Sequence, residues 1–527
     1  MLRHILICML TAWAFFSPAP VLAQSDRPLR IRIPVDAVSF DWNVAGEGLT
    51  RFIFTNIMDG LMTLDAKLAP VPALAQHVQV SADGLNYIIR VREGVKWSDG
   101  KPLTAEDFVT SWKRLLDPLE RKGSARHFRN VVHAAEYNAG ATHDFASVGI
   151  KAISMNVLGI TLSRPQTDFL SVLALPQLYP LRQDILARYG RAWHEPGKIV
   201  TLGPYFPLVH EAGKRIVLKR NALYWGPQPK ISTVEISVID EDAKAVAKFK
   251  AGELDFAIPL NFKEAGAVRQ LPTFRFASMF RTRTLFFNVT KYPLNLRPVR
   301  QAIRLALDRA ALGQYLQGMY GRADQWVNDA LLGPKPLKSE DLAENEEPPV
   351  DPARARALLK EAGVTPESLG KLELIVLSLD ENALVAGFLA SQLKQSLGLN
   401  IDVKLVSRDS LIQAVDLGAG HMVIYSRTSA YADAYPVLAS MLSESGENSS
   451  RWKNGSYDAI IHSIEGKPAG PARRQLIHEA LDLLLTREVP LVPLYAESFG
   501  YLVSPATQGL VVNPLAEINL RSVSFSK

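Results

Sequence analysis

Cysteine is almost absent from this chain, which has a single cysteine among its 527 residues. That residue, Cys8, lies inside an apolar segment near the N-terminus and not among the small residues that follow the segment. A lipid-modified cysteine would stand at a cleavage site, so we expect no lipid anchor. The rest of the chain has no thiol, which excludes disulfides, cysteine-ligated metals and a cysteine nucleophile there.

Long apolar runs are missing beyond the N-terminus. Residues 5–16 are apolar but too few to cross a bilayer, Arg3 precedes them, and helix-breaking prolines follow. This pattern predicts a secretion signal over residues 1–23, cleaved after the small residue Ala23. An uncleaved membrane anchor is the alternative, which the short run and the prolines disfavour. We therefore expect an exported protein without a membrane span.

Signatures of catalytic sites are missing too. There is no G-x-S-x-G elbow, no H-E-x-x-H, no S-x-x-K set with its partners, and no glycine loop for dinucleotides or phosphates. The formal net charge of +6 comes without a long lysine or arginine run. We expect no enzyme, no cofactor, no metal site and no nucleic-acid partner. A catalytic triad assembled from distant residues would leave no local signature and stays open.

The composition is that of a globular protein, with 47% apolar and 21% charged residues. At about 150 residues per domain, the length indicates roughly three domains. From about residue 370 onward strands alternate with helices, which predicts an α/β lobe with a partly parallel sheet. Expected strands cover residues 29–35, 85–95, 150–162, 216–220, 232–240, 285–289, 371–377, 401–406 and 489–495. Expected helices cover 104–116, 242–251, 298–311, 353–362, 383–397 and 471–486, with a loop over 333–352.

The most informative segment is residues 97–108, Trp-Ser-Asp-Gly-Lys-Pro-Leu-Thr-Ala-Glu-Asp-Phe. Asp99 and Gly100 predict a tight turn, and Thr104 followed by two carboxylates predicts the N-cap of a helix. The segment resembles the W-S-D-G-x-P-x-T-A-x-D-F motif of the family 5 extracellular solute-binding proteins. We interpret it as architecture and not as a ligand contact.

Further matches to that family follow in the expected order and cover nearly the whole chain after the signal. They are Met58-Asp59-Gly60-Leu61, Gly203-Pro204-Tyr205, Asn221-Ala222-Leu223-Tyr224-Trp225, Ala251-Gly252-Glu253-Leu254-Asp255, Phe287-Asn288, Val299-Arg300-Gln301-Ala302, Leu307-Asp308-Arg309 and Leu358-Leu359-Lys360-Glu361-Ala362-Gly363. No single tetrapeptide decides the matter, but the ordered set is similar to the family throughout.

The resemblance implies an α/β fold of the periplasmic-binding-protein type II kind, with two hinged lobes and an extra α/β domain. By analogy, lobe I comprises 24–56, 182–277 and 497–527, the extra domain 57–181, and lobe II 278–496. It implies a periplasmic monomer that captures peptides by hinge closure and delivers them to the permease subunits of an ABC importer in the inner membrane. A metal chelate, an opine, a cell-wall peptide or an oligosaccharide are alternative ligands. A secreted hydrolase, a chaperone and a chemoreceptor partner are alternatives from other classes.

The resemblance places the ligand near residues 429–436, which correspond to the family's W-x-x-D-Y-x-x-P segment. Asp433 is the candidate partner of a ligand ammonium group, because a buried charge needs a partner. Ala430 stands where the family has tryptophan, and the segment after Asp433 is shorter, so a reshaped pocket is possible. An N-cap of the following helix is the alternative role of Asp433.

Upstream, Arg427 is the candidate partner of a ligand carboxylate, with a solvated arginine as the alternative. Its neighbour Tyr425 is expected on the strand that leads into the site. The other pocket-wall candidates from the family pattern are Tyr431, Phe287, Asn288, Trp326 and Tyr495. Glu47, between Gly46 and Gly48, is a further candidate because it lies near another contact loop of the family. Core packing is the alternative for each aromatic residue.

Overall fold

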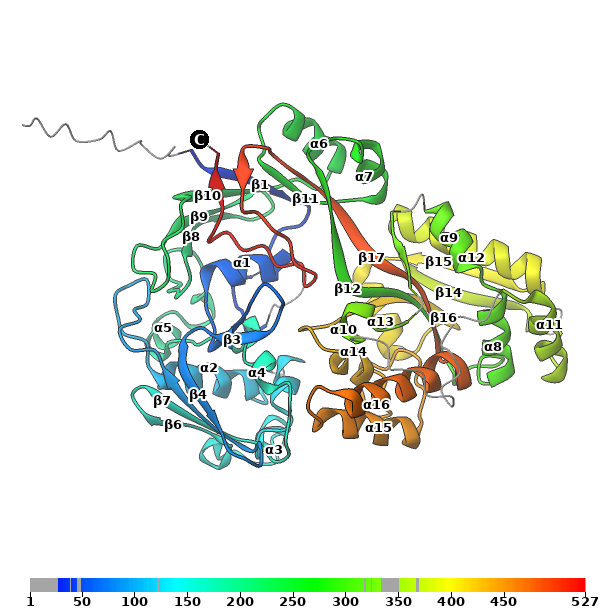
Figure 1. The fold of residues 1–527 in the computed structure, drawn as a ribbon, viewed down its shortest axis with the longest axis horizontal. Helices are drawn as coiled ribbons and strands as arrows, with labels where there is room; N and C mark the ends of the chain where they lie inside the picture. Colours follow the sequence, from blue (N-terminus) through cyan, green and yellow to red (C-terminus); the bar gives the residue numbers. More distant parts are fainter. Residues whose placement is uncertain are drawn as a thin grey trace, which may run out of the picture.

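The protein consists of two halves that lie side by side, as the computed structural model shows in Figure 1. Two long strands, β12 (Phe274–Phe287) and β17 (Leu491–Val503), run from one half to the other. We call residues 27–273 with 504–526 the first half, and residues 288–490 the second half. The structure describes residues 27–526 except 38, 45–48, 121–122, 317–318, 324, 333–349 and 366–368. None of the helices described there is long and apolar enough to cross a membrane.

One mixed sheet extends through both halves, because β12 and β17 pair with each other over most of their length. Strand β1 pairs in parallel with two neighbours, and so does β14, which makes the sheet partly parallel as expected. The strand order is β15 (Asn400–Val406), β14 (Lys371–Leu377), β16 (Met422–Thr428), β12, β17, β11 (Phe256–Leu260), β1 (Leu29–Ile33), β10 (Thr233–Val238), β9 (Arg215–Arg220) and β8 (Tyr205–Glu211), with β13 (Gly321–Arg322) beside β17.

A separate antiparallel sheet of β4 (Ala75–Val80), β5 (Asn86–Val91), β7 (Val157–Thr161) and β6 (Ile150–Ser154) lies in the first half. Helix α2 (Ala105–Leu116) packs against it and begins at the N-cap Thr104. The Asp107 carboxylate accepts from the Thr104 backbone N–H at 2.9 Å and from Trp97 Nε1 at 3.3 Å. Trp97 is fully buried. The Trp-Ser-Asp-Gly segment therefore supports the fold, as its turn and cap chemistry predicts.

The remaining elements surround the two sheets. In the first half they are α1 (Leu49–Ile57), β2 (Met62–Leu64), β3 (Pro70–Pro72), the 3₁₀ segment Gly123–Phe128, α3 (Ala134–Asn138), α4 (Phe169–Val172), α5 (Gln183–Tyr189), α6 (Asp242–Lys250), α7 (Phe262–Val268), β18 (Thr507–Gln508) and β19 (Ser524–Phe525). In the second half they are α8 (Arg297–Ala306), α9 (Arg309–Tyr315), α10 (Asp329–Leu332), α11 (Pro352–Glu361), α12 (Asp380–Leu397), α13 (Arg408–Leu417), α14 (Tyr435–Ala439), α15 (Gly455–Glu465) and α16 (Pro471–Asp482).

Three expectations need correction. The single helix expected over 298–311 is two helices, because the Asp308 carboxylate accepts from Ala311 N at 2.8 Å and caps a new helix. The short strands expected over 285–289 and 489–495 are parts of the much longer β12 and β17. Most of the loop expected over 333–352 lies outside the described residues.

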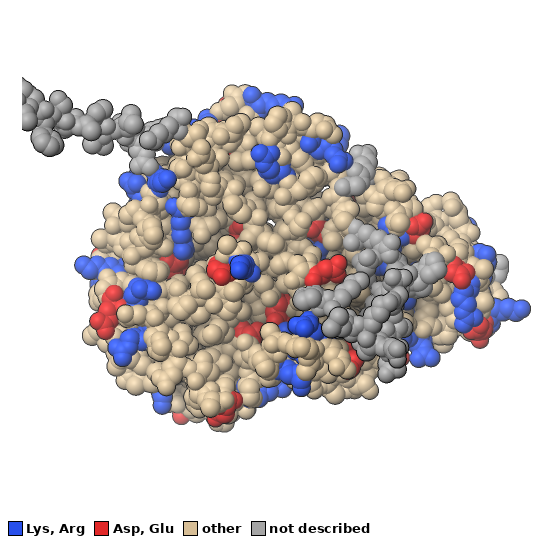
Figure 2. All heavy atoms as spheres, viewed as in Figure 1, with Lys and Arg blue, Asp and Glu red and all other residues tan. Residues whose placement is uncertain are grey.

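Each half has its own apolar core. The core of the first half gathers tryptophans and phenylalanines such as Trp42 and Phe54 around the two sheets. The second half has two clusters, one around Leu389 and one around Tyr457. On the face drawn in Figure 2, basic and acidic side chains are interspersed and form no extended patch of one sign. Packing within each half and few elements between them suit a molecule that can hinge along β12 and β17.

Candidate functional site

A cavity of about 440 Å³ lies between the two halves. The second half contributes the last four residues of β16, the loop that follows, helix α14 and the segment 442–447. The first half contributes Arg126 and His127 from its 3₁₀ segment, Arg129, and Arg164 from the loop after β7. A cavity of this size is within the range of small-molecule sites.

The wall formed by β16 presents an incompletely paired strand. On one side β16 pairs with β12 along its whole length, from Met422 to Thr428. On the other side the described residues of β14 pair only with Met422 and Val423. The end of β16 that faces the cavity therefore has one free backbone edge among the described strands, which can accept another extended chain.

Two side chains of this strand end were predicted from the sequence, and both line the cavity. Tyr425 is half-buried, and the Arg427 guanidinium lies 5.0 Å from the centre of its ring. Arg427 donates to Ser449 Oγ at 3.1 Å and to the backbone carbonyl of Glu447. Its Nε is buried and has no partner among the described residues. Arg427 is thus already engaged by the segment 447–449, and a ligand carboxylate would have to compete with these contacts.

Tyr431 is the third predicted residue on the cavity wall, and it contacts the opposite half. Its hydroxyl donates to the carboxylate of Asp168, which also accepts from Gln166 Nε2 at 2.8 Å. Burial raises the pKa of Asp168, although the tyrosine hydroxyl opposes this rise. This bond therefore joins the two halves next to the cavity.

The wall of the first half carries more cationic groups than the sequence reasoning found. Arg126, Arg129 and Arg164 all line the cavity. Burial and the neighbouring arginines lower the pKa of His127 to about 3, so its imidazole is neutral at neutral pH. The only sequence signal for this wall is the density of basic residues between 121 and 129. No group of acidic, histidine and cysteine side chains in the described residues could hold a metal ion.

Comparison with known proteins shows the family to which this chain belongs. The sequence model of the bacterial extracellular solute-binding proteins, family 5 (Middle), matches residues 69–449. The chain belongs to this family. The family consists of solute-binding proteins and not of enzymes, and its peptide-binding members serve ABC importers. The secreted-hydrolase alternative is thereby excluded.

Relatives of this family 5 protein align over nearly its full length. It is 27% identical over 478 residues to the probable deoxycholate-binding periplasmic protein YgiS of Escherichia coli K12, covering 90% of this chain and 89% of that one. It is 26% identical over 486 residues to the periplasmic oligopeptide-binding protein OppA of Salmonella typhimurium, covering 90% and 88%. The murein tripeptide binding protein MppA of Escherichia coli superposes with a TM-score of 0.82 at 23% identity, covering 95% and 99%. The structural match confirms the expected fold.

Asp433, the predicted amine partner in this family 5 protein, lies behind the cavity wall. Its Oδ1 accepts from Arg473 Nη2 at 2.8 Å and from the Tyr435 backbone N–H at 2.7 Å, at the start of α14. No partner of its Oδ2 is found among the described residues. The carboxylate thus contacts the start of α14, although the N-cap of this helix is Ala434 and not Asp433. A ligand contact by Asp433 stays a prediction.

The other predicted residues lie away from the cavity or outside the described chain. Phe287, Trp326 and Tyr495 are buried in the cores of the second half, where Tyr495 donates to Glu381 at 2.8 Å. Asn288 donates to the carbonyl of Gly418 at 2.9 Å. Glu47 lies outside the described residues. Core packing, the alternative role of the three aromatic residues, agrees with their burial. Ligand contacts by all five residues stay predictions.

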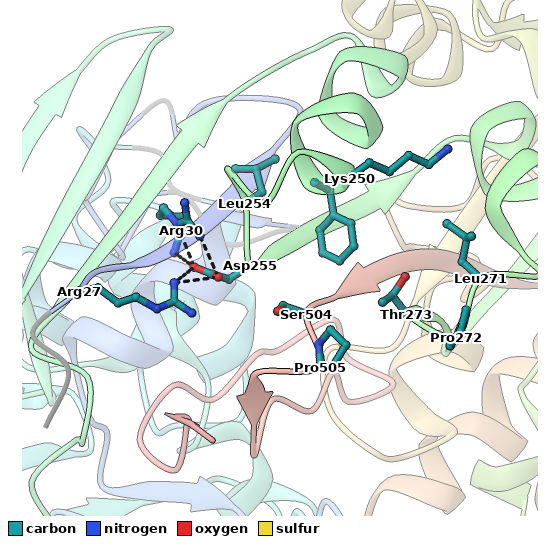
Figure 3. Close-up of a pocket in the computed structure, with 12 residues that line it drawn as sticks. Arg27, Arg30, Lys250, Leu254, Asp255, Leu271, Pro272, Thr273, Ser504 and Pro505 are labelled. Atoms are coloured by element: carbon teal, nitrogen blue, oxygen red, sulfur yellow. Dashed lines mark hydrogen bonds and ion pairs between the residues drawn. The ribbon is translucent and has the colours of Figure 1, made fainter. Parts of the chain in front are cut away.

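A second hollow, of about 620 Å³, lies at the surface of the first half (Figure 3). Asp255 occupies its wall and accepts from Arg27 at 2.9 Å and from Arg30 at 3.1 Å. Burial would raise the pKa of Asp255, but the two arginines hold it below its usual range. All lining residues belong to one half, so closure of the halves cannot enclose a ligand there. We therefore place the ligand site of this family 5 protein in the cavity between the halves.

Proposed function

We propose that this protein is the periplasmic substrate-binding component of an ABC importer, and that it captures peptides between its halves and delivers them to the membrane permease. The proposed lobes are 24–56 with 182–277 and 497–527, and 278–496, with 57–181 as an extra domain. The protein would act as a monomer released by cleavage after Ala23. Hinge closure along β12 and β17 would bury the ligand.

The free edge of β16 carries the peptide proposal. Residues 425–428 line the cavity and have no second neighbouring strand among the described residues. An extended peptide pairs with such an edge through main-chain hydrogen bonds, which give affinity without regard to side chains. Compounds without a peptide backbone gain nothing from this edge. The proposal therefore predicts that affinity depends on peptide amides.

Backbone methylation tests this dependence. Native mass spectrometry of the protein purified from its periplasm should first release a ladder of short peptides. Calorimetry should then show that N-methylation of one central amide of the best tripeptide weakens binding about tenfold, because a hydrogen bond is lost and its partner stays unpaired. An isomer methylated on a side chain serves as the control. Equal affinities for both compounds would contradict the strand-edge mode.

A second candidate ligand is an acidic amphipathic solute. The relative YgiS is named as probably deoxycholate-binding. The cavity of this chain combines tyrosine rings with the arginines Arg126 and Arg427, which suit an apolar body with a carboxylate. Calorimetry with deoxycholate distinguishes the two candidates. Micromolar binding of deoxycholate, with no binding of the peptide ladder, would replace the peptide proposal by this one.

The amine contact of Asp433 remains part of the peptide proposal. Its Oδ2 has no partner among the described residues, whereas Oδ1 is engaged by Arg473. Asp433→Asn should weaken a free-amine peptide about tenfold while changing its N-acetylated form less than twofold. Equal losses for the two peptides, measured by calorimetry, would remove Asp433 from the site.

A further inference from the structure

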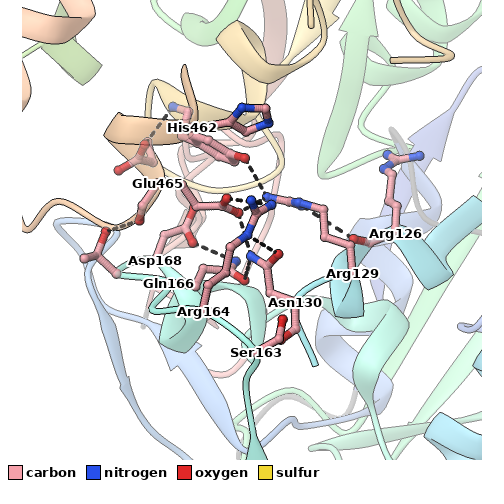
Figure 4. A network of polar contacts seen from close by, with 12 residues as sticks. Arg126, Arg129, Asn130, Ser163, Arg164, Gln166, Asp168, His462 and Glu465 are labelled. Carbon is pink, nitrogen blue, oxygen red and sulfur yellow. Dashed lines mark hydrogen bonds and ion pairs between the residues drawn. The ribbon is translucent and has the colours of Figure 1, made fainter. Parts of the chain in front are cut away.

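Glu465, at the last position of α15, is a carboxylate of the second half whose ion-pair partners among the described residues come from the first half (Figure 4). Its side chain is 1% exposed. It accepts from Arg129 Nη2 at 2.5 Å and from Asn130 Nδ2 at 2.6 Å, and it forms an ion pair with Arg164 Nη2 at 3.0 Å. A carboxylate can be buried only with such compensation, so these three partners explain why Glu465 is buried at all.

The backbone of Glu465 is held by the same half. Its carbonyl accepts from the Thr167 backbone N–H at 3.2 Å and from Thr167 Oγ1 at 3.1 Å. Side chain and carbonyl of one residue thus contact the first half at once. This double attachment fixes the end of α15 against the loop after β7.

Two of the three partners of Glu465, Arg164 and Asn130, are held in place by hydrogen bonds within the first half. Arg164 Nε donates to Asn130 Oδ1 at 2.8 Å, and Asn130 Nδ2 donates to Gln166 Oε1 at 3.0 Å. Gln166 in turn donates to Asp168 at 2.8 Å. These bonds lie within the first half and do not need the second half. Arg164 and Asn130 are therefore organised before Glu465 arrives, which lowers the entropy lost on contact.

The contact also completes the wall of the cavity. Arg129 and Arg164 line the cavity, and so do Tyr435, which accepts from Arg129 Nη2 at 2.8 Å, and Tyr431. The side chain of Arg129 is 37% exposed and lies outside the network that holds Arg164, so without Glu465 it has room to turn away from this wall. The bonds to Glu465 fix both guanidinium groups at one end of the cavity.

We propose that Glu465 is a positioning residue for ligand binding, which draws Arg129 and Arg164 across the gap and so holds the halves closed around a complete cavity wall. This inference rests on the capture by closure proposed above. The stronger the contact, the larger the fraction of ligand-free molecules that is already closed. Since a ligand binds only the competent fraction, loss of Glu465 lowers the apparent affinity by the factor by which that fraction falls.

Closure can be measured without any ligand. Apart from Cys8 in the expected signal, the chain has no cysteine, so exposed Ala135 on α3 and Ala459 on α15 can be changed to cysteine and carry spin labels. Both helices lie on the same side of the molecule, one in each half (Figure 1). Electron double resonance on residues 24–527 should give mainly a short distance. Glu465→Gln should shift the distribution toward longer distances, and Glu361→Gln on exposed α11 should leave it unchanged.

Affinity provides the second measurement. With the peptide that binds best, Glu465→Gln should raise Kd about tenfold, and Glu361→Gln less than twofold. Arg164→Gln, whose side chain is half-exposed, gives a second route to the same loss should the first variant fold poorly. In the double variant the loss of affinity should be much smaller than the sum of the two single losses, because both substitutions remove the same contact. Additive losses, or an unchanged distance distribution in both single variants, would overturn the proposal.

The two readouts separate this inference from the proposed function. A shift of the spin-label distances without binding of any peptide would retain the role of Glu465 in closure and reject the peptide proposal. Tight peptide binding with identical distances and Kd values in wild type and variants would reject the role of Glu465 alone.

Discussion

Two buried glutamates of this protein use the same chemistry in different places. Glu497 on β17 binds Arg281 at 2.6 Å and Arg283 at 3.0 Å, both on the paired strand β12. Glu465 binds arginines from the opposite half. Both carboxylates are at most 8% exposed as whole residues. The contact of Glu497 forms whenever the sheet is folded, because β12 and β17 are paired. The contact of Glu465 forms only when the two halves meet.

The two glutamates therefore contribute to different equilibria, Glu497 to folding and Glu465 to closure. Burial alone would raise the pKa of Glu497, but Arg283 and Arg281 outweigh it and hold that pKa below its usual range. The charged pair is therefore part of the folded sheet and contributes to the free energy of unfolding. The contact of Glu465 contributes to the free energy of closure and can be lost while each half stays folded.

The largest effect is expected for Glu497→Gln. The change removes the nearer countercharge of buried Arg283 and leaves only Glu381 among the described residues, 3.7 Å away. Breaking a buried pair in this way costs about 3 kcal/mol of the free energy of unfolding. Urea unfolding followed by tryptophan fluorescence measures this loss. Glu465→Gln should lose clearly less in the same experiment. Equal losses for the two variants would remove the distinction between a folding contact and a closure contact.

The next effect concerns the second contact between the halves. Tyr431→Phe removes the hydroxyl that donates to the buried carboxylate of Asp168, which then keeps the donor Gln166. An unsatisfied buried acceptor costs about 1–3 kcal/mol, and this cost arises only in the closed state. We expect Kd to rise about tenfold while the midpoint of urea unfolding hardly moves. If the variant loses stability and keeps its affinity, the bond between Tyr431 and Asp168 is a folding contact, like that of Glu497, and not a closure contact.

A smaller effect depends on pH and comes from His127, whose low pKa makes the folded protein sensitive to acid. Its pKa of about 3 in the folded protein lies below the value of about 6.5 in the unfolded chain. Between these values the unfolded state binds a proton that the folded state does not, so stability falls as the pH drops through this window. His127→Gln should lose less stability between pH 7 and pH 4.5 than the wild type, as judged by urea midpoints.

The same pH experiment sharpens the comparison in a second variant. Burial is the main cause of the low pKa of His127, and Arg126, Arg129 and Arg51 of the first half lower it further. Because His127 lines the cavity between the halves, opening exposes it, so the acid sensitivity should be smaller in Glu465→Gln than in the wild type. An unchanged sensitivity would show that the first half alone sets this pKa.

The smallest effect is expected for the exposed pair of Arg354 and Glu361, 2.7 Å apart on α11. Both side chains are about half exposed, and solvent screens such pairs strongly. Glu361→Gln should change the free energy of unfolding by less than about 0.5 kcal/mol and leave Kd unchanged. A larger change in urea unfolding would mean that exposed charge matters more in this protein than burial suggests.

The candidate site was only partly predictable from the sequence. Tyr425, Arg427 and Tyr431 were expected near the ligand and line the cavity, because a family motif marks their segment. Arg129, Arg164 and Glu465 were missed, since Glu465 follows Arg164 by about 300 residues and neither lies in a motif. The predicted core alternatives for Phe287, Trp326 and Tyr495 agree with their burial.

Local chemistry in the sequence determined the family, the α/β fold and elements such as the capped start of α2, because turns and caps depend on residues a few positions apart. It also excluded disulfides after the expected signal. The tertiary structure decided the length of β12 and β17, the free edge of β16 and the partners of Glu497 and Glu465. Pairing of distant strands and burial of charges depend on how the two halves meet, and no local pattern records that geometry.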